Sequence, residues 1–356
     1  MITLSICLIV KNEEKNIRNC LDSVKDFADE IIVVDTGSTD NTIDICKGYT
    51  DKVYKIWWQD DFSKARNYSF KKAKSDYIMW LDADDIITAE NIEKIKALKT
   101  TLPKGVDIVL MKYITSVFSS GEPRFYFYRE RIIRNSPKFR WQGFVHEYIS
   151  VLGNIVYENI SIFHNKAEGQ KYSTRNLKIY EKAKKKNKRF TSRDYYYYAR
   201  ELYYHKKYSK AISNFTKFLE LEKENQSDIY EAKLLVGECY FLQNKFDKAL
   251  EKYFQILQVF LPSSKLYCKI ADVFMVQKRL DLAICYYQQA LENHNPITQT
   301  FVEIEYQNII PCLQLCVAYY KKGNIKKAEQ YNAFAEKFDS QNRAVVYNKQ
   351  LFKNYK

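Results

Sequence analysis

The chain has 356 residues, a length that favours two domains over one, and 46% of these residues are hydrophobic, which argues against disorder. Only 9 Gly and 6 Pro occur, which argues against a turn-rich all-β fold. The net charge of +14 would suit nucleic acid, an anionic membrane, an acidic peptide or a phosphorylated substrate, and equally a lysine-rich solvated surface. No nucleic-acid-binding module and no stripe of basic and aromatic residues is present, so we expect no nucleic acid partner.

Cysteine use and the start of the chain bear on the compartment. The chain has 8 Cys, and none of them forms a CxxC pair or another paired metal spacing. The N-terminus is directly strand-like rather than a signal peptide, which predicts a reducing cytoplasm. The apolar run from Ile6 to Val10 is far too short to span a bilayer, so we expect no stable membrane insertion.

The first part of the chain alternates between strands and helices. Continuous apolar runs predict buried strands at residues 3–10, 30–35, 52–57 and 76–82. Helices are predicted after KNEEKNI, where Leu21, Val24 and Phe27 keep helical spacing, after TGSTDNT, and over 60–76, where Asp60 or Asp61 would be the N-cap. This alternation predicts an α/β domain with a right-handed, mostly parallel sheet.

Acidic residues follow three of these strands. Glu13 comes after the first strand, Asp35 after the second, and the segment DYIMWLDADD places Asp82, Asp84 and Asp85 after the fourth. In parallel sheets this edge is where ligands bind. Neighbouring carboxylates repel one another, so the cluster is either a solvated loop or the site of a cation. Oxygen ligands suit Mg²⁺ or Mn²⁺, which would bridge a substrate diphosphate.

From about residue 190 the pattern becomes purely helical and repetitive. Four alanines, 38, 34 and 45 residues apart, each begin a helix after a short polar turn. A small residue lies twelve positions before each alanine. A bulky residue follows each small residue by three positions. The alanines are Ala211, Ala249, Ala283 and Ala328; the small residues are Ala199, Gly237, Ala271 and Cys316; the bulky ones are Leu202, Tyr240, Phe274 and Tyr319. The pattern resembles tetratricopeptide repeats, whose concave surfaces often bind peptides. Plain helical hairpins that serve packing or dimerisation are the alternative.

We therefore predict an α/β nucleotide-sugar domain over residues 1–170, extending to about 185 at most, and an all-α tetratricopeptide-like domain over 186–356. The span from 100 to 135 carries no motif, and we expect it to hold loops that face an acceptor.

Four sequence blocks in the first part carry a more specific resemblance. SICLIVKNEEKNIRNCLDSV, EIIVVDTGSTDNT, DDFSKARN and YIMWLDADD resemble family 2 glycosyltransferases with the GT-A (Rossmann-like) fold in order, spacing and content over residues 3–85. The resemblance implies that Lys11, Asn12 and Glu13 contact the uridine and that Asp35 meets the base or ribose. It also implies that Asp82 and Asp84 form the DXD motif that contacts ribose and metal.

The nucleotide-sugar site predicted from this resemblance is larger than these residues. It comprises Val10, Lys11, Asn12, Glu13, Asp35, Ser38, Arg66, Asn67, Asp82, Ala83 and Trp141. The metal, Mg²⁺ or Mn²⁺, would be held by Asp84, Asp82 and His146.

The segment FRWQGFVHEYI at 139–149 stands where the family's catalytic base is expected. Phe139, Trp141 and Phe144 would form a platform for a sugar, Glu147 is the candidate base, and His146 is a candidate ligand of the metal or diphosphate. A purely structural role for His146 stays open. His164 is a further metal candidate, because some GT-A enzymes bring a later histidine to the metal. No TED or QxxRW motif occurs, which argues against a processive polysaccharide synthase.

The pairing of these two domains resembles bacterial peptide S-glycosyltransferases that modify cysteine in glycosylated bacteriocins. The resemblance implies an inverting, metal-dependent transfer of a hexose from a UDP-sugar to Cys, or to Ser or Thr, of a bacteriocin precursor in the bacterial cytoplasm. It also implies a homodimer through the helical domain. Two alternatives remain: a cytoplasmic enzyme acting on a cell-envelope glycan or lipid, and a non-enzymatic repeat scaffold with an inactive nucleotide-sugar domain.

Overall fold

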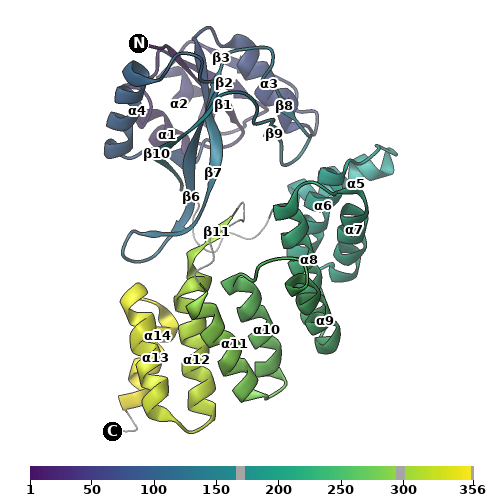
Figure 1. Cartoon of the computed structure of the whole chain (residues 1–356). Coiled ribbons are helices and arrows are strands. Elements are labelled where there is room, and N and C mark those ends of the chain that lie inside the picture. The colour runs from purple at the N-terminus through teal and green to yellow at the C-terminus, as the bar shows by residue number, and fades with distance from the viewer. Residues whose placement is uncertain (166–172, 294–300, 354–356) are drawn as a thin grey trace. The chain divides into compact units, whose positions relative to one another are not determined.

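A computed structural model describes residues 1–165, 173–293 and 301–353. The chain divides into two compact units (Figure 1). The first consists of Met1–Ser116 and Tyr126–Lys171, and the second of Val117–Phe125 and Tyr172–Lys356. A short piece from the first half of the sequence, residues 117–125, is thus counted with the helical second unit.

The first unit is built on one large sheet in which most strand pairs are parallel. Its strands lie in the order β3-β2-β1-β4-β7-β6-β10-β5. Their bounds are β1 Leu4–Val10, β2 Glu30–Asp35, β3 Val53–Lys55, β4 Tyr77–Leu81, β5 Asp85–Ile86, β6 Ile108–Val117, β7 Pro123–Arg134 and β10 Ile155–His164. The β1–β2, β1–β4, β2–β3 and β6–β10 pairs are parallel, whereas β7 runs antiparallel to β4 and β5 antiparallel to β10. The predicted α/β fold is confirmed.

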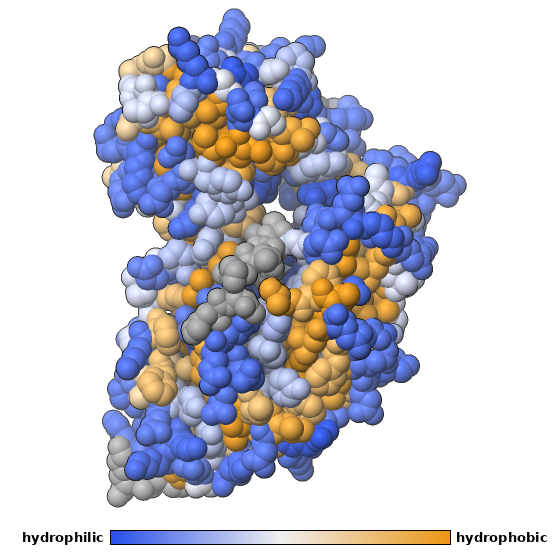
Figure 2. Space-filling model, in the orientation of Figure 1, coloured by the Kyte–Doolittle hydropathy of each residue, from blue (hydrophilic) through white to orange (hydrophobic). Residues whose placement is uncertain are grey.

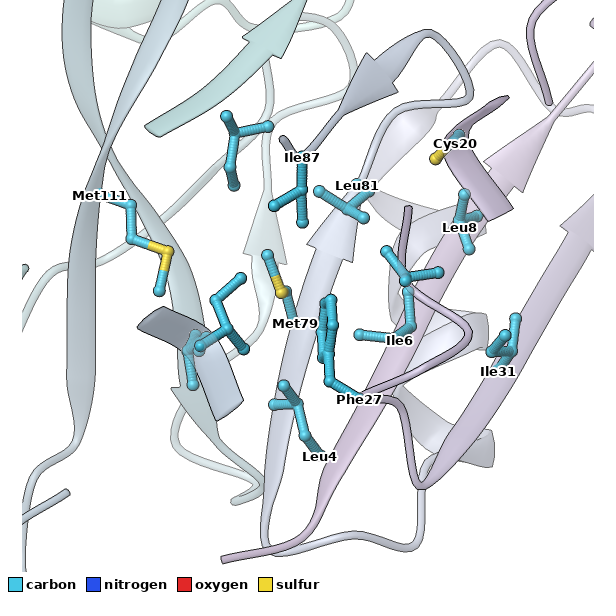
Figure 3. Packing of buried hydrophobic residues seen from close by; sticks show 14 of the residues in the cluster. Leu4, Ile6, Leu8, Cys20, Phe27, Ile31, Met79, Leu81, Ile87 and Met111 are labelled. Carbon is cyan, nitrogen blue, oxygen red and sulfur yellow. The ribbon is translucent and has the colours of Figure 1, made fainter. Parts of the chain in front are cut away.

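Helices cover both faces of this sheet. The helices are α1 Ile17–Asp22, α2 Thr42–Lys47, α3 Phe62–Lys72 and α4 Ala89–Thr101. Buried residues of α1, α2 and α4 pack with Ile6 and Leu8 of β1 and Met79 of β4 on one face (Figure 3), and Phe70 of α3 packs with Trp80 on the other. The carboxyl ends of β1, β2 and β4 are therefore fixed by a core on each side.

Two local expectations can be compared with these helices. Asp61 accepts a hydrogen bond from the backbone N–H of Lys64, as predicted for the N-cap of α3. The helix α1 is shorter than the helical spacing of Leu21, Val24 and Phe27 predicted. It ends where the hydroxyl of Ser23 bonds the Cys20 carbonyl, and the turns that follow still bury Val24 and Phe27.

The second unit consists of helical hairpins. Its helices are α5 Arg175–Lys185, α6 Ser192–Tyr204, α7 Tyr208–Leu221, α8 Gln226–Phe241, α9 Phe246–Leu257, α10 Ser264–Val276, α11 Leu280–Glu292, α12 Ile309–Lys321, α13 Ile325–Phe338 and α14 Arg343–Lys353, with the short elements β11 Val302–Glu303 and η1 Ile304–Gln307. The pairs α6–α7, α8–α9, α10–α11 and α12–α13 pack as antiparallel hairpins, one for each predicted repeat.

Each hairpin turns in the same way, which explains the sequence repeat. Two or three residues after the first helix of each hairpin comes a residue with a left-handed backbone. The N–H of the next residue then bonds back to the carbonyl of the bulky residue of the repeat, as Lys207 does to Leu202. The left-handed residues are Lys206, Asn244, Lys278 and Gly323. The small residues of the repeat are buried between the paired helices, so that the helices approach closely.

The second unit also contains a charge cluster built from its own chain. Lys265 of α10 pairs with Glu231 of α8 (3.1 Å) and with Glu303 of β11 (2.7 Å), and Lys269 pairs with Glu238 (2.6 Å). These residues form what we call the helical charge cluster. Within residues 117–125, Arg124 pairs with Glu305 of η1, and Ser119 donates to Asp339 (2.6 Å).

On the face shown in Figure 2, hydrophilic residues cover much of both units and hydrophobic residues come to the surface in patches. In the part of the chain that the structure describes, no helix combines the length and apolar composition that crossing a membrane requires.

Candidate active site

The loops that follow β1 and β2 are tied together at the carboxyl edge of the sheet. The backbone N–H of Asn12 donates to Ser38 Oγ (3.0 Å), and Asn12 Oδ1 accepts from the N–H of Thr39 (2.8 Å). Asn12 has a left-handed backbone (φ 55°), a conformation that asparagine tolerates better than most residues. Two predicted nucleotide contacts, Asn12 and Ser38, are therefore neighbours.

The remaining predicted residues of these loops differ in exposure. Val10 is buried at the end of β1, Lys11 is exposed, and the backbone N–H of Glu13 donates to Thr42 Oγ1 (2.7 Å). Asp35 is buried and accepts from the N–H groups of Gly37 (3.1 Å) and Ser38 (3.0 Å). Their contacts with a nucleotide stay predictions.

Arg66 joins two predicted residues from distant parts of the chain. Its Nη2 lies 2.6 Å from Asp82 Oδ1 and its Nε lies 2.6 Å from Glu147 Oε1. The guanidinium is buried against the rings of Trp80 (4.9 Å) and Trp141 (4.7 Å). The helix α3, the end of β4 and the segment between β8 (Trp141–Gln142) and β9 (Tyr148–Ile149) thus meet at one arginine.

The charges in this group stabilise one another. Burial would raise the pKa of Asp82, but the positive charges of Arg66 and Arg131 outweigh burial and hold that pKa below its usual range. Burial likewise opposes the charge of Arg66, yet Asp82 and Glu147 raise the pKa of its guanidinium. Asp82 and Arg66 are therefore a charged pair at neutral pH.

The aromatic residues of the 139–149 segment are buried rather than displayed. Phe139, Trp141 and Phe144 are each at most 5% exposed, and Trp141 packs edge-on against Trp80 (4.9 Å between ring centroids). Asn67 holds this segment in place, because it exchanges hydrogen bonds with the backbone N–H and carbonyl of Trp141 (2.9 Å each). Trp141 thus contacts the site through Arg66, and its contact with a sugar stays a prediction.

Asp85 is the most enclosed acid of the DADD segment. It is fully buried; its Oδ2 accepts from Arg131 Nη1 (2.9 Å) and from the backbone N–H of Asp82 (2.9 Å), and its Oδ1 accepts from the hydroxyl of Tyr113 (2.8 Å). Arg131 on β7 and Tyr113 on β6 are therefore part of the site. The sequence analysis did not include them. The signal for Arg131 was its position directly before the apolar pair Ile132 and Ile133, because an arginine in a buried strand needs a carboxylate partner.

Asp84, Asp85 and His164 form a group that could hold a metal ion. One ligand atom from each lies within 4.8 Å of the others, and His164 Nδ1 is 3.4 Å from Asp84 Oδ1. Carboxylate oxygens suit Mg²⁺ and Mn²⁺, so these residues fit the predicted cation. Burial would lower the pKa of His164, but hydrogen bonds to Asp84 and Asp85 outweigh it and raise the pKa to about 10. A bound cation would take the place of that proton, because imidazole binds metals in its neutral form.

This group differs from the predicted metal set in two members. Among the described residues it includes neither Asp82, which pairs with Arg66, nor His146. His146 has a left-handed backbone (φ 51°) just before Glu147, and Ala83 is buried between Asp82 and Asp84. The histidine that reaches the acidic residues is His164, because β10 pairs with β5 and places His164 opposite Asp85.

Two family models match the chain. Residues 5–152 match glycosyl transferase family 2, and residues 199–265 match a tetratricopeptide repeat. The first match contains the predicted nucleotide-sugar residues and the candidate base Glu147, whereas the further metal candidate His164 lies beyond it; the second match lies in the α6–α10 region.

Curated relatives resemble parts of the chain. The SPbeta prophage-derived glycosyltransferase SunS of Bacillus subtilis is 36% identical over 183 residues, which cover 49% of this chain and 42% of SunS. A TPR repeat-containing protein of Synechococcus elongatus is 34% identical over 149 residues (42% of this chain, 36% of that protein), and glycosyltransferase GlyA of Streptococcus pneumoniae is 28% identical over 180 residues (47% and 22%). The chain thus matches less than half the length of each relative. Its first unit therefore carries a domain that matches glycosyl transferase family 2, and its second unit carries a match to tetratricopeptide repeats.

Proposed function

We propose that the protein is an inverting, metal-dependent glycosyltransferase that moves a hexose from a UDP-sugar to a peptide side chain, cysteine above all and Ser or Thr as further acceptors. The observation that carries this proposal is the arrangement at the carboxyl edge of a family 2 sheet. There Arg66 joins Asp82 to Glu147, and Asp84 and Asp85 lie beside His164.

Each group has a place in the chemistry. A divalent cation held by Asp84, Asp85 and His164 would neutralise the charge of the departing diphosphate. The bond between the sugar C1 and the diphosphate oxygen breaks while a bond from C1 to the acceptor sulfur forms on the opposite face. Glu147 orients the acceptor and takes its proton where one has to be removed. Arg66 keeps Glu147 in place through its 2.6 Å ion pair.

Cysteine is the favoured acceptor for a chemical reason. A thiol with a pKa of ~8.5 already supplies some thiolate near neutral pH, so little base strength is needed. The peptide nature of the acceptor is supported by the repeats and by the resemblance to peptide S-glycosyltransferases, and a homodimer through the helical unit is proposed on the same resemblance.

A cell-envelope glycan or lipid is the second candidate acceptor, and the net charge of +14 is the observation that favours it. The two acceptors are distinguished by incubating the full chain with a helical cysteine peptide and with anionic vesicles. Mass gain of one hexose on the peptide supports the first candidate, and flotation with the vesicles supports the second.

The proposed activity is tested by nucleotide release from a panel of UDP- and GDP-hexoses with Mn²⁺ or Mg²⁺, in the presence of a cysteine peptide. We expect release that requires the cation and falls at least ~100-fold in Asp84→Asn. Asp107→Asn is the control, because Asp107 pairs with Arg134 and is not a member of the group formed by Asp84, Asp85 and His164. Absence of both release and UDP binding would overturn the proposal.

A further inference from the structure

Asp85 is positioned by two residues that the proposed chemistry does not use. We propose that Arg131 and Tyr113 are positioning residues that hold Asp85, and with it His164, where a divalent cation can be bound. The inference rests on the proposed function, because it concerns the cation of that site.

Asp85 has little freedom of its own. Both of its oxygens accept hydrogen bonds, and neither it nor Arg131 has any side-chain surface open to solvent. A fully buried carboxylate keeps its charge only when a partner compensates it, and Arg131 is that partner. The position of Asp85 is therefore set by the groups around it rather than by solvent.

Arg131 is held more tightly than an ion pair alone requires. Its guanidinium lies 3.9 Å from the ring centre of Trp80 and 4.2 Å from that of Tyr113, and its Nη1 also donates to the Trp80 carbonyl (3.1 Å). Its Nε and Nη2 are buried and find no hydrogen-bond partner among the residues that the structure describes. Unpaired buried donors cost stability, and an apolar residue of similar size is often at least as stabilising as a buried ion pair. Stability alone therefore does not account for an arginine here.

Tyr113 connects the arginine to the histidine. Its hydroxyl donates to Asp85 Oδ1 (2.8 Å) and lies 2.9 Å from His164 Nδ1. Its ring covers the guanidinium of Arg131 and lies 5.7 Å from the imidazole of His164. The buried side chain of Tyr113 thus contacts Asp85, His164 and the arginine that pairs with Asp85.

The same sheet contains a matched pair that lacks these links. Arg134, three residues further along β7, pairs with Asp107 (3.1 Å) and lies 5.5 Å from the ring of Tyr77, whose hydroxyl donates to the Val106 carbonyl (2.7 Å). Tyr77 and Arg134 face each other across β4 and β7. Neither residue contacts the Asp84, Asp85 and His164 group through any hydrogen bond or ion pair found in the described residues, so they are suitable controls.

The test is the affinity of the full chain for Mn²⁺, measured by electron paramagnetic resonance with UDP present. We expect Tyr113→Phe and Arg131→Lys to weaken Mn²⁺ binding by ~10–100-fold, the usual effect of removing groups that orient metal ligands. Lysine keeps the charge of Arg131 but loses its planar fork. Tyr77→Phe and Arg134→Lys should bind Mn²⁺ like the wild type, and thermal unfolding identifies the variants that fold.

The outcomes separate the inference from the proposed function. If folded Tyr113→Phe binds Mn²⁺ as the wild type does, the residues are structural and the inference is wrong. Tyr113→Phe decides the question even if Arg131→Lys fails to fold, because it removes a single oxygen atom. If the wild type binds no Mn²⁺, the metal-dependent function and the inference fail together. An equal loss of affinity in all variants, controls included, would also contradict a specific positioning role.

Discussion

Two regions of the molecule bury charge in different ways. In the helical charge cluster, Lys265 lies between Glu231 and Glu303, and Lys269 pairs with Glu238. In the acidic edge, by which we mean Asp82, Asp84 and Asp85, two carboxylates pair with buried arginines and Asp84 lies beside His164. Each carboxylate of the helical cluster pairs with a lysine of its own unit, whereas Asp84 of the acidic edge has a titratable histidine beside it.

The difference explains what each region is suited for. Lysine and arginine stay charged at all physiological pH values, so the helical cluster is a permanent structural feature. A histidine beside carboxylates gives up its proton to a cation that offers more charge. We therefore expect a divalent cation at the acidic edge and none at the helical cluster, whose carboxylates pair with lysines.

The largest effect is expected from changing the candidate base of the edge. Glu147→Gln should slow transfer to a serine peptide by ~10²–10⁴-fold, because a hydroxyl depends on proton removal, and should have a mild effect on the matching cysteine peptide. The two peptides are compared by intact mass, with the exposed Glu122→Gln as the control. An equally large loss on cysteine would contradict the proposed role.

Substitutions in the helical charge cluster should change the stability of the protein and leave its affinity for metal unchanged. Lys265→Met leaves Glu231 and Glu303 without their shared partner and should lower the free energy of unfolding by about 3–5 kcal/mol. Glu303→Gln should lower the free energy of unfolding by less, because Lys265 still pairs with Glu231 in this variant. Urea unfolding measures both values. Equal losses in the two variants would show that the cluster is not organised around Lys265.

A further prediction tests the close approach of helices in the repeats. A Cβ at Gly237 would lie 2.4 Å from Cε1 of the buried Tyr253, so Gly237→Ala should destabilise the protein by about 1–3 kcal/mol through overpacking. At Gly323 a Cβ meets no described atom within 4 Å, so the left-handed backbone (φ 77°) is what opposes Ala there. The double variant Gly237→Ala/Tyr253→Leu should recover part of the loss; no recovery would exclude this ring as the cause.

The smallest effect concerns a carboxylate of the first unit outside the acidic edge. Burial would raise the pKa of Glu30, but Lys52, Ser5 and the backbone N–H of Lys74 outweigh it and lower the pKa to about 2. A lowered pKa stabilises the fold above the unfolded value of ~4.3 and loses this contribution as pH falls toward 2. Glu30→Gln should therefore cost about 1 kcal/mol at pH 7, after allowance for screening by solvent. This difference should shrink below pH 4, and a difference independent of pH would contradict the assignment.

The sequence predicted the features that depend on local pattern. The four strands, the N-cap at Asp61 and the repeat built on Ala211, Ala249, Ala283 and Ala328 all follow from spacing within a few residues, and the structure confirms them. The position of the acidic edge follows from the alternation of strands and helices, because parallel strands place their carboxyl ends at the same edge of a sheet.

The partners of the acidic residues could not be predicted in the same way. Asp85 and Arg131 are 46 residues apart, and they meet because β7 inserts antiparallel next to β4. His164 reaches the group through the pairing of β10 with β5, while the sequence placed His146 next to the candidate base, Glu147. Such contacts depend on which strands pair over long stretches of the sequence, and the local apolar pattern of each strand does not show this.

The most direct test of the account is the location of the cation. Crystals of the full chain grown with Mn²⁺ and UDP would show the ion by anomalous scattering. We predict one peak within coordination distance of Asp84 and His164, with Asp85 held beside it by Arg131 and Tyr113. A peak on His146, or none in crystals that contain bound UDP, would contradict the account of the acidic edge.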